Sequence, residues 1–246
     1  MYTQSWKDIM DQVDDFFKHS SGTVWFRGHN NASYTLNSGL FRLNIESLKE
    51  YVTLEEQMYR YYKNLGHLLH GNENGWELLY SMQHHGVKTR LLDWTESFAV
   101  ALYFAIDGWK NGTARIWMLD PIGLNYLSKG ERKIISPKEV SYPGRYLNTN
   151  ENINSLAIYP IKNDVRIISQ HGVFTVQGNS LQPLEEEFNG KLVKDGYLKP
   201  VDLNLDARED ALNFLRLNGL NYFSLFPDLD GLSRYLNDVL IKPAWL

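Results

Sequence analysis

Residues 83–95 read Gln83-His84-His85-Gly86-Val87-Lys88-Thr89-Arg90-Leu91-Leu92-Asp93-Trp94-Thr95. Most of these side chains form hydrogen bonds, yet Leu91, Leu92 and Trp94 are apolar residues that anchor the segment to a core. A polar segment that is fixed in this way is typical of a rigid binding site carried by a loop. The segment therefore predicts both the centre of the fold and the place of a site.

The residues that follow this segment predict a buried helix. From Phe98 to Ile106 nearly every side chain is apolar, so a helix that reaches about Asp107 should be surrounded by protein. Thr95 is expected to cap its N-terminus, where free N–H groups and the helix dipole favour an anion. The alternative is that Asp93 and Arg90 pair with each other or cap helix ends, while the histidines lie on the surface.

Arg27 is the second candidate site residue. Val24, Trp25 and Phe26 predict a short buried strand that ends at Arg27-Gly28. The glycine lets a ligand or another backbone approach closely, and the arginine fork suits a phosphate or a carboxylate. The alternative is a purely structural ion pair with a nearby acid.

The whole chain, residues 1–246, is expected to form a single α+β domain with a helix-rich N-terminal half and a small, mostly antiparallel sheet. Its core motifs lie at about 22–180, and C-terminal helices at 206–240 pack on them. Helices are expected after a cap at Ser5, at 45–69, at 76–82 and at 207–217 with Asp206 as cap, and residues 226–236 are expected to open a last helix. Strands are expected at 115–119, 157–161, 165–168 and 173–176.

A third segment, Gln170-His171-Gly172, echoes Gln83 to Gly86. Gln170 is expected between two strands at the rim of the sheet, where its amide can reach a ligand hydroxyl. The alternative is a tight turn that Gly172 makes possible.

Composition excludes several classes of function. The chain contains no cysteine, so disulfides, thiolate zinc sites and cysteine nucleophiles are excluded. A net charge of -4 disfavours non-specific binding of duplex DNA.

The longest apolar run, Phe98 to Ile106, is too short to span a membrane, and the N-terminal residues do not resemble a signal peptide, so a cytoplasmic protein is expected. No metal site is expected, because the histidines are scattered and HExxH is absent; P-loop, Rossmann and serine-hydrolase motifs are absent as well.

The chain resembles the FRG domain family. The resemblance rests on Trp25-Phe26-Arg27-Gly28, Leu40-Phe41-Arg42, residues 83–95 with the helix motif Ala101-Leu102-Tyr103-Phe104-Ala105, Arg166-Ile167 with Gln170, Gly172 and Phe174, and Leu225-Phe226-Pro227-Asp228-Leu229. Lys88, where proline is common, and Gly39, where serine is usual, depart from the pattern. The family resembles parts of bacterial and phage-encoded conflict systems.

The layout of these motifs is also similar to that of ADP-ribosyltransferases. Those enzymes carry a basic residue on a first strand, a Ser/Thr-bearing strand that leads into an Ala-x-x-Phe-Ala helix, and a polar residue on a third strand. The resemblance implies that Arg27 holds the NAD pyrophosphate or ribose, that Thr95 and Ala101–Ala105 form the second motif, and that Gln170 occupies the third. Gln170 replaces a glutamate, and Asp93 is the candidate for the missing carboxylate. Further NAD contacts are expected from Gln83, His85, Thr89 and Arg90.

The expected function is therefore an NAD-dependent ADP-ribosyltransferase or NAD glycohydrolase, a toxin or phage-defence effector, with a protein or RNA acceptor and no membrane partner. One alternative is a non-catalytic module that senses a nucleotide or a phage protein through the same pocket. A weaker alternative is a metal-dependent nuclease that uses Asp93 and the histidines.

Overall fold

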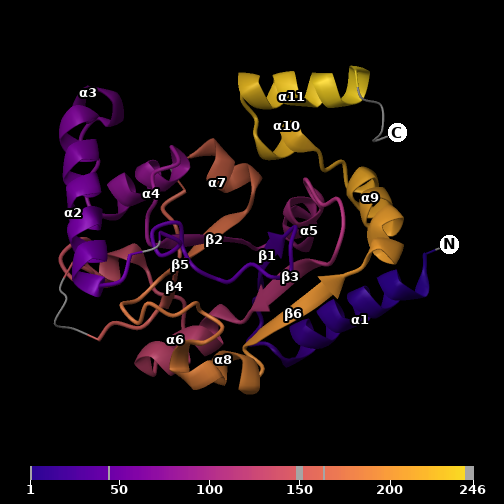
Figure 1. Cartoon of the computed structure of the whole chain (residues 1–246), viewed down its shortest axis with the longest axis horizontal. Coiled ribbons are helices and arrows are strands. Elements are labelled where there is room, and N and C mark those ends of the chain that lie inside the picture. Colours follow the sequence, from indigo (N-terminus) through magenta and orange to yellow (C-terminus); the bar gives the residue numbers. More distant parts are fainter. Residues whose placement is uncertain (1, 44, 148–151, 163, 242–246) are drawn as a thin grey trace.

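The computed structural model describes residues 2–43, 45–147, 152–162 and 164–241. Its centre is a six-stranded sheet in the order β4-β5-β2-β1-β3-β6, and every neighbouring pair is antiparallel (Figure 1). The strands are β1 (Trp25–His29), β2 (Leu91–Thr95), β3 (Ala114–Leu119), β4 (Leu156–Ile158), β5 (Gly172–Val176) and β6 (Leu198–Leu203).

The sheet is weakly joined at its middle. β1 pairs with β3 over its whole length, and β2 pairs with β5 over its whole length. β1 and β2, in contrast, are paired at one position, where Phe26 lies opposite Thr95. The sheet therefore consists of two halves, β4-β5-β2 and β1-β3-β6, that separate beyond this position.

Three helices cover one face of the β1-β3-β6 half: α1 (Gln4–His19), α5 (Phe98–Ile106) and α9 (Arg208–Leu217). Their apolar faces pack with alternate residues of the strands, among them Phe26, Ile116 and Val201. Gly28 is essential to this packing, because a Cβ atom there would lie 1.9 Å from the carbonyl oxygen of Ala101 in α5.

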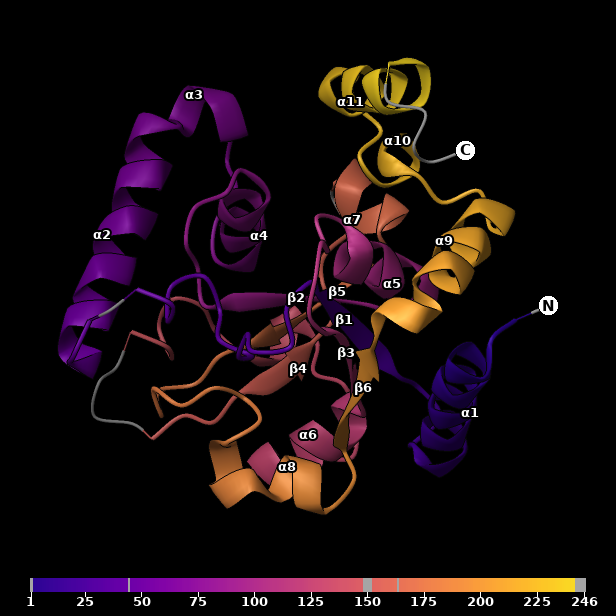
Figure 2. The same ribbon diagram turned by 45° about the vertical axis from the view of Figure 1, so that its right-hand side comes forward.

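The opposite face is covered by α6 (Pro121–Lys129) and α8 (Lys191–Lys194), which lie side by side in both ribbon views (Figure 2). Here Trp25, Trp94 and Trp117 form an aromatic layer with leucines of both helices. A separate core lies over β4-β5-β2 and includes α4 (Trp76–His84).

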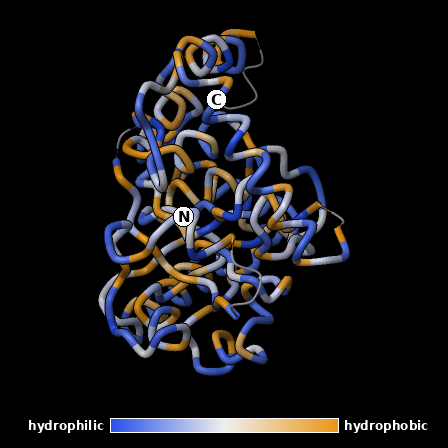
Figure 3. The backbone as a smooth tube through the Cα atoms, turned by 90° about the vertical axis from the view of Figure 1, so that its left-hand side faces the viewer, coloured by the Kyte–Doolittle hydropathy of each residue, from blue (hydrophilic) through white to orange (hydrophobic). Residues whose placement is uncertain are grey.

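The remaining helices lie at the periphery. α2 (Leu48–Leu65) and α3 (His67–His70) extend on one side, while α7 (Val165–Ser169), α10 (Tyr222–Leu225) and α11 (Leu229–Leu240) adjoin one another on another side (Figure 2). Short 3₁₀ turns occur at Pro137–Glu139, Glu187–Gly190 and Leu205–Ala207. Apolar and hydrophilic residues alternate along the C-terminal helix (Figure 3), as expected for an amphipathic helix. Among the described residues, no helix is both long and apolar enough to cross a bilayer.

The mixture of helices with an antiparallel sheet is confirmed, but several elements differ from expectation. Residues 165–168 form helix α7 rather than a strand, because Asp164 caps the segment by accepting a hydrogen bond from the N–H of Arg166. Leu91 to Thr95 form strand β2 rather than a loop. β6 and α6 were not expected, whereas β1 and β3 were.

Several helix starts and ends also differ. Thr3, not Ser5, caps α1, and Ser97, not Thr95, caps α5, since the hydroxyl group of each accepts the N–H of a residue in the first turn. α9 begins after Ala207 without a side-chain cap from Asp206. The helix expected at 45–69 is divided at Gly66 into α2 and α3.

Candidate functional site

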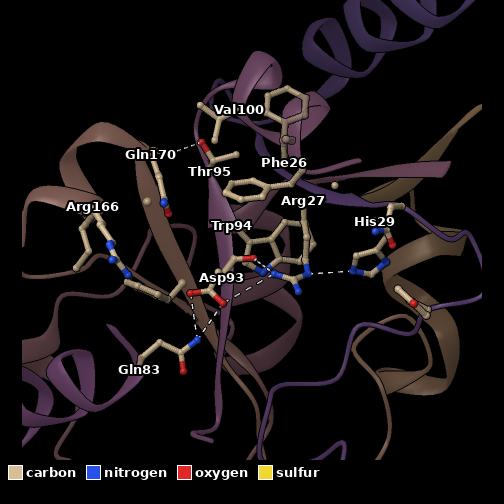
Figure 4. Close-up of a pocket in the computed structure, with 18 of the residues that line it drawn as sticks. Phe26, Arg27, His29, Gln83, Asp93, Trp94, Thr95, Val100, Arg166 and Gln170 are labelled. Atoms are coloured by element: carbon tan, nitrogen blue, oxygen red, sulfur yellow. Dashed lines mark hydrogen bonds and ion pairs between the residues drawn. The ribbon is translucent and has the colours of Figure 1, made fainter. Parts of the chain in front are cut away.

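A cleft of about 740 Å³ lies where the two half-sheets separate (Figure 4). Its walls come from β1, β2 and α5, from α4 and α7, and from the segment that follows β1. The same cleft contains Arg27, Gln83, Asp93, Thr95 and Gln170, which sequence analysis selected from three distant parts of the chain.

Arg27 lies in the gap between β1 and β2. Its Nη1 donates to the backbone carbonyl of Asp93 at 2.6 Å and lies 4.0 Å from the Asp93 carboxylate, while its Nε donates to Nε2 of His29 at 3.0 Å. The second terminal nitrogen, Nη2, has no hydrogen-bond partner in the described part of the chain. Burial lowers the pKa of Arg27 to about 10, with Asp93 opposing the shift, so the guanidinium stays charged at neutral pH.

His29 orients this guanidinium. Burial, reinforced by the charges of Arg27 and Arg42, lowers the pKa of His29 to about 3. The imidazole is therefore neutral near pH 7, and its Nε2 can accept the Arg27 Nε–H. His29 was not expected to be part of the site; its place two residues after Arg27 in the same strand puts both side chains on one face.

The Asp93 carboxylate is held by a chain of hydrogen bonds. The Thr89 hydroxyl donates to Oε1 of Gln83 at 2.6 Å, and the Gln83 amide donates to both carboxylate oxygens of Asp93 at 2.9 and 3.1 Å. The Asp93 side chain remains 58% exposed, so it is oriented and also accessible from the cleft. Thr89 itself is buried behind Gln83 and supports the site without facing the cleft.

Gln170 and Thr95 meet through the backbone. The Thr95 hydroxyl donates to the carbonyl of Gln170 at 2.7 Å, and the Gln170 side-chain amide donates to the carbonyl of Leu225 at 3.1 Å. Gln170 is the residue that ends α7 rather than a residue between two strands, but it lies at the start of β5 and lines the cleft as expected. Thr95 is engaged in holding this turn and the N–H of Ser97.

Arg90 and His85 are not in the cleft. The Arg90 side chain is 0% exposed and forms an ion pair with Glu55 of α2, with further hydrogen bonds to the carbonyl of Gln177 and to Asn179. Arg90 neither pairs with Asp93 nor lines the cleft, because its side chain points from the residue before β2 into the interior toward Glu55. His85 lines a second cavity of about 580 Å³, whereas its neighbour His84 borders both cavities and pairs with Asp164 at 2.9 Å.

Sequence analysis also gave no role to Arg42 and Arg166, which line the cleft with Arg27. Arg166 donates to Asp228 at 2.6 Å and lies over the ring of Phe226. Among the described residues that line the cleft, Asp93 is the only carboxylate. The cleft thus presents three guanidinium groups and one carboxylate beside an aromatic wall of the partly exposed Phe104 and Phe226. This combination favours an anionic ligand that also carries a planar ring.

The described residues contain no group of three His, Cys, Asp or Glu side chains that could hold a metal ion. The metal-dependent nuclease therefore stays an expectation that nothing in this geometry favours.

Comparison with known families identifies the part of the chain that holds this site. Residues 22–113 match the model of the FRG domain. This segment is an FRG domain. The FRG match contains β1, β2, α4 and α5, and with them Arg27, Gln83 and Asp93; Arg166, Gln170 and Phe226 lie beyond it on the same cleft. Comparison with curated proteins and with solved structures found no match.

Proposed function

We propose that the FRG-domain protein binds NAD in this cleft and cleaves its nicotinamide–ribose bond, as an ADP-ribosyltransferase or as an NAD glycohydrolase. The observation that carries the proposal is the meeting of the Arg27 guanidinium and the Asp93 carboxylate in the gap of the sheet, beside an aromatic wall. Arg27 provides charge for the diphosphate, and the wall accepts a ring.

Asp93 is the residue proposed to act on the reacting atoms. When the bond between the ribose anomeric carbon and the nicotinamide nitrogen breaks, its electron pair leaves with nicotinamide, and positive charge develops on the ribose. A carboxylate fixed by Gln83 stabilises that charge. Water or an acceptor nucleophile then forms the new bond to the anomeric carbon and releases its proton to the solvent. Fixing the carboxylate beforehand matters, because a group that needs no reorganisation stabilises the transition state more than the ground state.

The order of the strands supports this proposal. The resemblance to ADP-ribosyltransferases places the three motifs on three strands whose side chains must meet at one ligand. β1 and β2 carry Arg27 and Thr95, while Gln170 ends α7, two residues before β5 begins. The three strands are neighbours in the order β5-β2-β1, so all three residues line one cleft. A toxin or phage-defence role, with a protein or RNA acceptor, belongs to the same proposal through the family resemblance.

Nicotinamide release from NAD tests the proposal. The purified protein should release nicotinamide, and Asp93→Asn should lower the turnover rate by about a hundredfold, as for loss of one electrostatic group in an active site. Asp195→Asn is the matched control, because Asp195 is an exposed aspartate at the end of α8 and does not line the cleft. Absence of release, together with absence of a thermal shift with NAD, would exclude the proposal.

The second candidate is a module that binds a nucleotide without turning it over. It is favoured by Gln170, an uncharged amide whose N–H is already engaged by Leu225. In this case Arg27→Lys, which keeps the charge but loses the fork, should weaken NAD binding about tenfold in calorimetry, while the unaltered protein binds NAD and releases no nicotinamide.

A further inference from the structure

Arg42 is a second guanidinium at the cleft that the preceding proposal does not use. Arg42 lies in the segment that follows β1, and its Nε donates to the carbonyl of Asn37 at 2.9 Å. Its two terminal nitrogens have no hydrogen-bond partner in the part of the chain that the structure describes. One edge of the guanidinium is thus fixed by the protein, while the other edge stays available.

The segment that carries Arg42 is held firmly in place. The N–H of Ser38 donates to the side-chain oxygen of Gln177 at 2.7 Å, and the Gln177 amide donates back to Asn37 at 2.9 Å. The N–H of Leu40 donates to the carbonyl of Thr89 at 2.9 Å, and the Leu40 side chain is fully buried. Little conformational entropy is therefore lost when Arg42 binds a ligand, since its backbone is already ordered.

Arg42 and Arg27 act on the same space. Both side chains line the same cleft, Arg27 from β1 and Arg42 from the segment that follows it. The charge of Arg42 also lowers the pKa of both Arg27 and His29, as expected of a neighbouring cation. His29 is neutral and takes only the Nε–H of Arg27, and Asp93 takes Nη1. Two cations that repel each other in a partly enclosed cleft are stabilised by a shared anion.

We propose that Arg27 and Arg42 together form a seat for a diphosphate group, so that the ligands of this cleft are nucleoside diphosphates and dinucleotides rather than monophosphates. A diphosphate carries more charge than a monophosphate and has oxygens on two phosphorus atoms, so each guanidinium can bind its own phosphate. The inference rests on the proposed function in that it concerns the same cleft, and it adds Arg42 as a specificity-determining residue.

Calorimetric titration with inorganic pyrophosphate, without divalent metal and at low salt, tests the seat. Pyrophosphate should bind in a ratio of one per chain, and inorganic phosphate should bind about tenfold more weakly. Arg42→Gln should raise the Kd for pyrophosphate about tenfold, and Arg27→Lys should do so too. Arg60→Gln is the matched control, because Arg60 lies on the exposed face of α2 beside Tyr61 and should leave the Kd unchanged. If Arg42→Gln does not fold, Arg42→Lys gives the same comparison with the charge retained.

Competition identifies the source of the diphosphate. ADP and NAD should displace pyrophosphate, and AMP should do so less well. The seat is refuted if pyrophosphate does not bind, if AMP competes as well as ADP, or if Arg42→Gln and Arg60→Gln behave alike. Pyrophosphate binding that depends on Arg42, without nicotinamide release, supports the seat and removes the enzymatic proposal. If the protein releases nicotinamide but Arg42→Gln leaves pyrophosphate binding unchanged, the enzymatic proposal stands and the diphosphate seat is refuted.

Discussion

Glu55→Gln is expected to destabilise the protein strongly although Glu55 lies outside the cleft. Glu55 is 2% exposed and accepts hydrogen bonds from Arg90 on both carboxylate oxygens and from Tyr142 at 3.0 Å. The substitution leaves a fully buried Arg90 without its counter-charge, which costs about 3–5 kcal/mol in comparable cases. Glutamine keeps one acceptor oxygen, so the lower value of about 3 kcal/mol is expected, or a fall of roughly 6–12 °C in Tm for a chain of this size.

Thermal unfolding followed by circular dichroism measures this effect. Glu56→Gln provides the control, because Glu56 is the next residue of α2 and is exposed. It removes the same charge from the same helix and should change Tm by no more than about 2 °C, as for most surface substitutions. If Glu55→Gln and Glu56→Gln unfold at the same temperature, the buried Arg90–Glu55 pair does not contribute to stability in the way described.

Two further predictions concern the β1 strand. Gly28→Ala should destabilise the protein by about 3 kcal/mol or more, because its Cβ would overlap the backbone of α5 at the Ala101 carbonyl, a clash that only movement of the helix relieves. Gly39→Ala, whose Cβ would approach only the flexible Lys88 side chain at 3.3 Å, should be nearly neutral in the same denaturant titration; equal losses would contradict the steric argument. Folding lowers the pKa of His29 from 6.5 to about 3, so the unfolded chain takes up the proton first as the pH falls. The free energy of unfolding should therefore decrease by about 2 kcal/mol between pH 6.5 and roughly pH 5. This acid-side loss, measured by urea unfolding at each pH, should diminish in His29→Asn and persist in the exposed-site control His19→Asn.

The parts of the fold that could be predicted are those where one pattern dominates. The continuous apolar run from Phe98 to Ile106 specifies a buried helix in any context, and alternating runs specify β3 and β5. Residues 165–168 were assigned wrongly because three β-branched or apolar residues in a short run do not separate a strand from one helical turn; the Asp164 cap decides the outcome. β6 was missed because Pro200 lies within it, and proline is tolerated there since β6 is an edge strand.

The candidate site shows the same limit. Arg27 and Gln170 were selected because polar residues near a glycine at the end of a strand are typical of sites, and both lie in the cleft, where their role stays a prediction. Arg90 was not, because the sequence alone cannot show that Glu55, distant along the chain, neutralises it inside the core. Arg42 was noted only as part of a family motif and His29 not at all, because their roles depend on the fold that brings the Arg42 charge and the His29 ring beside Arg27.

The one-position pairing of β1 with β2 has a mechanical consequence. Elsewhere in the sheet, several backbone hydrogen bonds resist any change in the spacing of two strands. Between β1 and β2 most of these backbone bonds are missing, and the guanidinium of Arg27 joins the two strands through its hydrogen bond to the Asp93 carbonyl. A ligand that draws this guanidinium away from the Asp93 carbonyl breaks this hydrogen bond between the strands. We therefore expect occupancy of the cleft to change the relative twist of the two half-sheets, and with it the positions of β4 and β6 at the two edges of the sheet.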